Sequence, residues 1–149
     1  MVATRCNFPP KAEATTTYTV IWTIANSSSA VSGATVSATL PENVTWLGSI
    51  SPQTENVQYD SNSRTVTWNA GSLAAYSGQD GEQQRQVSFQ VALYPNITDV
   101  GNPLTIVNPS TLSATDNFTG ITVYSDWGAL TTRLSTDPGF QDGDDLVTK

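Results

Sequence analysis

The sequence predicts an all-β domain of seven to nine strands, built as a sandwich or a barrel. Apolar and polar residues alternate with a period of two along most of the chain, as in strands that are buried on one face. The 8 prolines fall between the alternating runs, where they do not interrupt a strand. No stretch keeps a helical period for three turns. The 149 residues are enough for one ordinary domain.

Five strands are expected in the first half of the chain. The first lies in "TTTYTVIWTIAN", and a serine-rich loop separates it from the second, "ATVSATLP". A short third strand follows in "NVTWLGSI", and "VQYDSNSRTVTWNAG" is typical of a hairpin that turns at "DSNSR". The predicted core residues of these strands are Tyr18, Val20, Trp22, Ile24, Val36, Val66 and Trp68.

The second half alternates most regularly in "QQRQVSFQVALYP", which places Val87, Phe89 and Val91 in the core and Ala92 on the outside. The run "STLSATDNFTGITVYS" predicts a second hairpin that turns at "DNFTG". Short strands are expected in "PLTIVN" and "ALTTRL". From residue 136 the alternation stops, and glycine, proline and aspartate dominate. We therefore expect an N-terminal extension at 1–14, the sandwich at 15–135 and an acidic linker or domain junction at 136–149.

Several short elements follow one another in a characteristic order. A first strand ends near Asn26, a second reaches Leu40–Pro41, a short strand contains Val44–Trp46, and a hairpin ends in an element made of Trp68, Asn69, Gly71 and Leu73. This order resembles the conserved repeat domains of unknown function in bacterial and archaeal surface proteins. The resemblance covers residues 15 to 135. It implies an immunoglobulin-like β-sandwich, without catalytic residues, in arrays on large exported proteins. The chain itself contains a single copy and no internal period.

The composition excludes several classes of function. The formal net charge is -7, and the 6 basic residues are scattered, which argues against nucleic acid and anionic membrane surfaces as partners. No apolar run approaches the roughly 18 residues of a membrane span. The chain has no histidine, no G-x-S-x-G element and no phosphate loop. We therefore predict no enzymatic activity.

Cys6 is the single cysteine, so no internal disulfide can form. Its side chain is either an inert thiol, a modification site or the partner in an intermolecular disulfide.

Calcium is the best ligand hypothesis, against the alternative that the chain has no cofactor. The tail segment "DPGFQDGDD" offers four carboxylates within nine residues, and calcium requires six to eight oxygen ligands. The spacing does not match an EF-hand loop, so a solvated acidic linker is the competing interpretation. The candidate ligands are Asp137, Asp142, Asp144 and Asp145.

Two further hypotheses concern binding and cross-linking. Trp46 and Trp127 lie near predicted loops and Tyr76 lies in a glycine-rich loop, so these three could form an exposed platform on which a sugar ring stacks. An internal amide crosslink would join Lys11 to Asn117 or Asp116; the competing interpretation is an exposed lysine.

We predict a structural or interaction module of an exported, extracellular cell-surface or adhesin-like protein. It would act as a spacer or a protein-interaction unit whose partners are neighbouring domains or copies of the same surface protein. One alternative is a module that binds a carbohydrate or a calcium-dependent ligand. Another is a subunit of an extracellular filament, in which a terminal segment pairs with the exposed strand edge of a neighbour.

Overall fold

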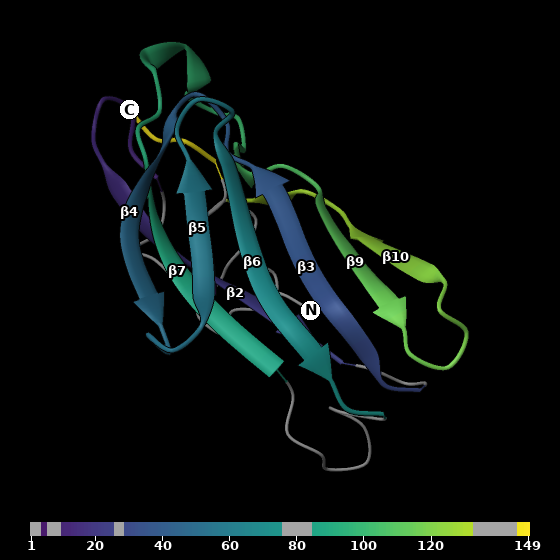
Figure 1. Cartoon of the computed structure of the whole chain (residues 1–149). Coiled ribbons are helices and arrows are strands. Elements are labelled where there is room, and N and C mark those ends of the chain that lie inside the picture. Colours follow the sequence, from purple (N-terminus) through teal and green to yellow (C-terminus); the bar gives the residue numbers. More distant parts are fainter. Residues whose placement is uncertain (1–3, 6–9, 26–28, 76–84, 133–145) are drawn as a thin grey trace.

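The computed structural model describes residues 4–5, 10–25, 29–75, 85–132 and 146–149. These residues form an all-β sandwich of two antiparallel sheets (Figure 1). The first sheet contains, in spatial order, β1 (Thr4–Arg5), β2 (Thr16–Ile24), β7 (Arg85–Leu93) and β4 (Val44–Ser51). The second contains, in spatial order, β10 (Thr122–Trp127), β9 (Ser110–Asp116), β3 (Val31–Thr39), β6 (Thr65–Leu73) and β5 (Asn56–Asp60).

Two short strands and one helical turn complete the fold. β8 (Thr105–Val107) pairs with β11 (Leu130–Thr131), and the 3₁₀ turn η1 spans Ile97–Asp99. Eleven strands therefore form within the described residues, where seven to nine were predicted. Of the three shortest strands, β8 and β11 lie in "PLTIVN" and "ALTTRL", where short strands were expected. β1 was not expected, because two residues are too short to leave an alternating pattern in the sequence.

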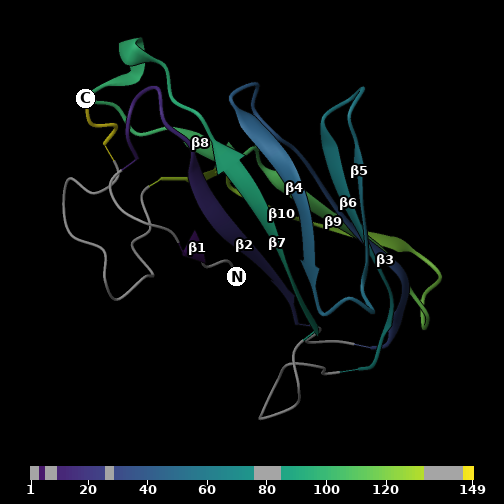
Figure 2. The same cartoon turned by 90° about the vertical axis from the view of Figure 1, so that its left-hand side faces the viewer.

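The strand order is that of an immunoglobulin-like sandwich. In that fold the sheets contain strands A-B-E-D and C-F-G. The chain crosses from β2 to β3 and from β7 to β9, so that β1, β2 and β7 take the places of A, B and E, and β3, β9 and β10 those of C, F and G. β4 takes the place of D, next to β7, and the fold differs in the β5–β6 hairpin, which follows β4 in the chain and extends the second sheet beside β3. Figure 2 shows the two layers from the side.

Inward-facing side chains from both sheets form one core. The ten residues expected there from the sequence are all buried: Tyr18, Val20, Trp22, Ile24, Val36, Val66, Trp68, Val87, Phe89 and Val91. The rings of Trp22 and Phe89 meet edge to face, with centroids 5.0 Å apart, a favourable geometry for aromatic pairs. Ala92, expected on the outside, is buried as well. It lies between Thr17 and Thr45 of the flanking strands, and their side chains are large enough to cover a methyl group.

Residues 10–12, which precede β2, pack against the C-terminal residues 146–149. The backbone N–H of Ala12 donates to the carbonyl of Thr148 at 2.7 Å, and the N–H of Thr148 donates to the carbonyl of Pro10 at 2.8 Å. Val147 is buried, and its carbonyl accepts a hydrogen bond from Gly101. Pro10 and Val147 belong to the segments that the sequence analysis placed on either side of the sandwich, and both are buried.

Candidate functional site

The sandwich has three regions where side-chain chemistry could serve a function. The first is the predicted binding platform of Trp46, Tyr76 and Trp127. The second is a cavity around Glu55. The third is the hairpin formed by β9 and β10.

The predicted platform does not assemble in the part of the chain that the structure describes. The ring of Trp46 on β4 stacks on Tyr59 of β5 with centroids 5.5 Å apart, and it also contacts the buried Phe89. Trp127 is the last residue of β10 and is partly buried against the core. β10 and β5 are the two edge strands of the second sheet. The two tryptophans therefore lie on different edges, and each uses its ring for packing. Tyr76 lies outside the described residues.

The predicted calcium ligands cannot be placed. Asp137, Asp142, Asp144 and Asp145 all lie outside the described residues. Among the residues that are described, no group of three or more His, Cys, Asp or Glu side chains could hold a metal ion. Calcium binding by the tail therefore stays a prediction.

The residues considered for an internal crosslink lie far apart in the fold. Lys11 is exposed and bridges Thr148 at the C-terminal end of the chain. Asp116 and Asn117 instead begin the β9–β10 turn, where Asn117 donates its backbone N–H to the carbonyl of Ala30. The described geometry brings no lysine to these two residues.

Glu55 forms a small network that the sequence does not reveal. One of its carboxylate oxygens accepts a hydrogen bond from Trp68 Nε1 at 2.7 Å, and the other accepts one from Arg85 Nε at 2.7 Å. Burial raises the pKa of Glu55, but the hydrogen bonds from Arg85 and Trp68 outweigh burial and hold the pKa below its usual value. Glu55 therefore stays ionised at neutral pH.

This network lines a cavity of about 640 Å³ at one end of the sandwich, between the β4–β5 connection and the beginning of β7. The described lining contains one carboxylate, which Arg85 neutralises, and otherwise uncharged side chains. Hydrolysis of a glycoside requires two carboxylates that flank the bond. The network therefore fits a structural role, since it gives the buried indole of Trp68 a hydrogen-bond acceptor.

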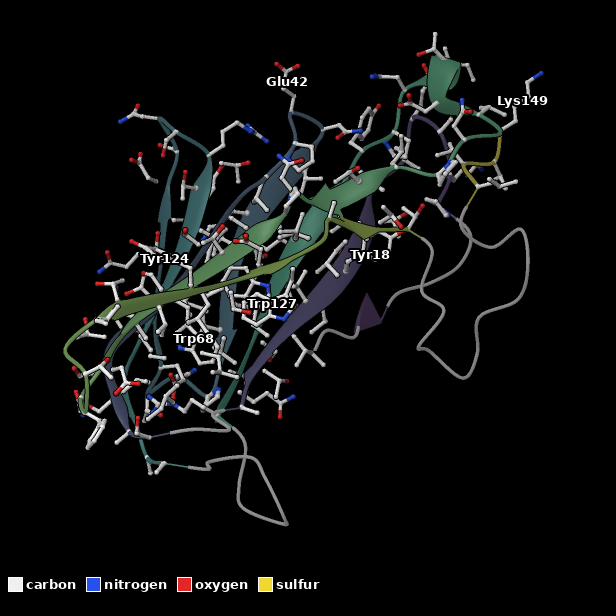
Figure 3. All side chains as sticks on the ribbon, turned by 90° about the vertical axis from the view of Figure 1, so that its right-hand side faces the viewer. Tyr18, Glu42, Trp68, Tyr124, Trp127 and Lys149 are labelled. Carbon is white, nitrogen blue, oxygen red and sulfur yellow. The ribbon has the colours of Figure 1, made fainter. Side chains whose placement is uncertain are left out.

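The β9–β10 hairpin carries apolar side chains that are exposed to solvent. Phe118 is 88% exposed, Tyr124 72%, Ile121 63% and Val123 44%. Figure 1 shows β10 at the outer edge of the second sheet, and Figure 3 shows Tyr124 on this strand, on the side of the molecule that faces the viewer. Val123 lies on the same face as Ala114, whereas Tyr124 lies on the opposite face. Several exposed apolar side chains on one element mark interaction sites more often than single ones do.

The turn of this hairpin is held by a dense set of hydrogen bonds. Asp116 Oδ1 accepts the backbone N–H of Phe118 at 2.8 Å and the hydroxyl of Ser29 at 2.9 Å. These donors, Phe118 first, hold the pKa of Asp116 below its usual value. Ser32 Oγ donates to the side chain of Asn117. The turn is thus fixed to the start of β3 while the ring of Phe118 points into solvent.

The exposure of β10 has a structural cause. The stacking of Trp46 on Tyr59 shows that β4 lies over the β5 side of the second sheet. The opposite edge of the first sheet, on the β10 side, is β1, which is two residues long. Within the described residues, β10 therefore extends past the strands of the first sheet, and Val123 is exposed although it shares a face with the buried Ala114.

No family model matches the chain, and none of the curated proteins matches its sequence. The resemblance to surface-protein repeat domains therefore stays a prediction, whereas the fold that it implied is confirmed by the strand order. The described residues contain no helix long and apolar enough to cross a membrane.

Solved structures of bacterial pilins share the fold. The chain aligns with a variant of BcpA, the major pilin subunit of Bacillus cereus, with a TM-score of 0.53 and 13% identity over 88% of this chain and 39% of the pilin. For BcpA itself the TM-score is 0.52 with 11% identity, over 88% of this chain and 39% of the pilin. Two domains of SpaD, the major pilin from Corynebacterium diphtheriae, align with a TM-score of 0.51 and 10% identity over 88% of this chain and 51% of that one. The chain thus spans about two fifths to one half of these pilin structures.

Proposed function

We propose that the chain is a non-enzymatic structural and interaction module of an exported surface or filament protein. The observation that carries this proposal is the β9–β10 hairpin, which holds Phe118 and Tyr124 in solvent; these are the two most exposed of the large apolar side chains that the structure describes. Holding apolar groups in a fixed, exposed position prepares a surface for contact with another protein, because little conformational entropy is then lost on binding. The likeness of the fold to pilin domains supports the same proposal.

The charge and the core fit this role. A formal net charge of -7 keeps the module soluble. The core contains the large side chains Trp22, Trp68, Tyr18 and Phe89, all fully buried, so the module can form a stable unit by itself. Contact with copies or neighbouring domains of the same protein is the interaction that we favour.

Surface labelling of intact cells tests the proposal. An antibody raised against the folded chain should label intact cells of the source organism, and protease added from outside should remove the signal. A cytoplasmic protein followed in the same samples controls for lysis. Labelling that appears only after the cells are broken would contradict an exported module.

A further inference from the structure

The outer edge of β10 carries backbone N–H and C=O groups that pair with no other described strand. The backbone N–H of Asp116 donates to the carbonyl of Ile121, and the register continues without a shift from Thr122 opposite Thr115 to Trp127 opposite Ser110. Successive residues of an antiparallel strand direct their N–H and C=O groups alternately to the two sides. Since Ile121 bonds toward β9, Thr122, Tyr124 and Asp126 direct theirs away from the sheet. No hydrogen bond between these groups and another described residue is present.

Other edges of the sandwich are protected against pairing. In β4 the register shifts between Trp46 and Ile50, where Gly48 has a φ of +80°, and such a bulge interrupts the ladder. β1 contains only two residues, and β5 has five. β10 has six residues without a bulge, a proline or a lysine, and its one charged residue, Asp126, lies next to its end, so its edge is blunted less than that of β4 or β1.

The charges around β10 favour a second copy of the same chain. Two copies that each carry a net charge of -7 repel one another over most of their surfaces. The stretch from Asn117 to Ser125 contains no charged residue, so an approach along β10 avoids most of this repulsion. The single acid of the strand, Asp126, lies near one end, so antiparallel pairing places the two Asp126 carboxylates at opposite ends of the contact.

We propose that β10 of two copies pair antiparallel about a twofold axis that passes through Tyr124. The residues whose polar groups face outward have even numbers, so the pairing that joins them sets Tyr124 against Tyr124, and Thr122 against Asp126 of the second copy. Val123 then lies against Ser125 of the second copy. This register keeps the inner faces of the two sheets on the same side, because paired residues of an antiparallel ladder share a face.

The pairing deepens the proposed function, on which it rests, by naming the contact that joins copies. It continues the second sheet from one copy into the other and covers the exposed rings of both Tyr124 side chains. Six residues per strand form a small interface, so the free dimer is reversible and depends on concentration. In an array that holds copies close together, the effective concentration raises its occupancy.

Charge variants at the twofold axis test the pairing by sedimentation of the full chain over a concentration series. The wild-type chain should form a discrete dimer. Tyr124→Lys places two ammonium groups directly opposite one another, and it should raise the dimer dissociation constant roughly tenfold or more. Mixing Tyr124→Lys with Tyr124→Glu should restore dimers. The control is Tyr94→Lys, since Tyr94 is also half exposed but lies outside β10, and it should dimerise like the wild type.

Disulfide trapping tests the register, in a Cys6→Ser background that removes the natural thiol. Tyr124→Cys should crosslink, because hydrogen-bonded partners have Cα atoms about 5.5 Å apart, within the range of a disulfide. Asp126→Cys alone should not crosslink, since its two copies would lie about 13 Å apart along the strand. An equal mixture of Thr122→Cys and Asp126→Cys should give mixed dimers.

Three outcomes would overturn the proposal. They are a wild-type chain that stays monomeric at all concentrations, open-ended aggregates instead of a dimer, and crosslinking at Asp126→Cys equal to that at Tyr124→Cys. Thermal melts of each variant show whether the sandwich has kept its fold. Cell-surface labelling can succeed while the chain is monomeric, so failure of this pairing is distinguishable from failure of the proposed function.

Discussion

The second sheet contains two hairpins whose turns have the same local structure. One hairpin is tied to neighbouring elements, and the other carries exposed apolar side chains. The β5–β6 turn follows Asp60, and the β9–β10 turn follows Asp116; in each, the aspartate accepts the backbone N–H two residues further on. The fourth residue of each turn has a positive φ, 56° at Arg64 and 72° at Gly120. The two turns therefore share an aspartate-capped start and the same backbone shape, although Arg64 stands where the other turn has Gly120.

The two hairpins differ in what lies next to them. Arg64 donates to the carbonyls of Leu40, Pro41 and Val44 and so ties its turn to the connection between β3 and β4. Glu55, just before β5, bonds to Arg85 of the first sheet. The β9–β10 hairpin has no such link to the first sheet among the described residues. Turn chemistry thus sets the shape of a hairpin, while the strands of the opposite sheet decide whether its surface is buried or free.

Outside the core, the largest effect should come from Arg64→Ala. A left-handed φ is unfavourable for an arginine, and the three hydrogen bonds of the guanidinium compensate for it. Their removal should lower the free energy of unfolding by about 2–3 kcal/mol, measured by urea denaturation. Arg64→Gly, which relieves the backbone but also loses the bonds, should lose less than Arg64→Ala. A change below about 0.5 kcal/mol for Arg64→Ala would mean that Arg64 does not anchor the hairpin.

A smaller, pH-dependent effect should follow from Glu55→Gln. The pKa of Glu55 is lowered in the folded state, so the carboxylate adds stability above its unfolded pKa of about 4.3. This contribution is lost as the pH falls through the folded pKa. Because Arg85 is partly exposed, we expect about 1 kcal/mol at neutral pH.

Urea denaturation at pH 7 and at pH 3 checks this expectation. The difference between the wild type and Glu55→Gln should shrink at the lower pH. Glu42→Gln is the matched control, because Glu42 is exposed and should show little difference at either pH. An equal deficit for Glu55→Gln at both pH values would show that the ionised carboxylate is not responsible.

The smallest effect on stability should come from Phe118→Ser in the free hairpin. The ring of Phe118 is almost fully exposed, so its loss should change the free energy of unfolding by less than about 0.5 kcal/mol. Phe89→Ala in the core is the contrasting variant and should cost about 3–5 kcal/mol. Both are measured at a concentration where the chain is monomeric. A loss of several kcal/mol at Phe118 would mean that this hairpin is packed after all.

Much of the fold could be predicted because its signals are local. The alternation that ends at Ile24 and the one around Phe89 identify buried strands, and the segments that begin at Asp60 and Asp116 identify both hairpin turns. These signals depend on residues close in sequence. They do not depend on which strand lies opposite.

The rest depends on partners far apart in the sequence. Arg64 looked like one scattered basic residue, and its three acceptors lie 20 to 24 positions away. Glu55 reaches Arg85 over 30 positions. Ile121 and Val123 alternate with a polar residue like the inward face of a covered strand, yet among the described strands the first sheet has only the short β1 on that side. Nothing near β10 in the sequence indicates that lack of cover.

The parallel contact between residues 10–12 and 146–149 has a mechanical consequence. Lys11 and Thr148 form a parallel bridge, and the hydrogen bonds of Ala12 and Thr148 lie side by side across it. Tension applied between Pro10 and Lys149 pulls two parallel segments in opposite directions along their length. Such a load shears these hydrogen bonds together instead of unzipping them one after another. A module joined to its neighbours at these two points would therefore resist extension at the contact that closes the sandwich.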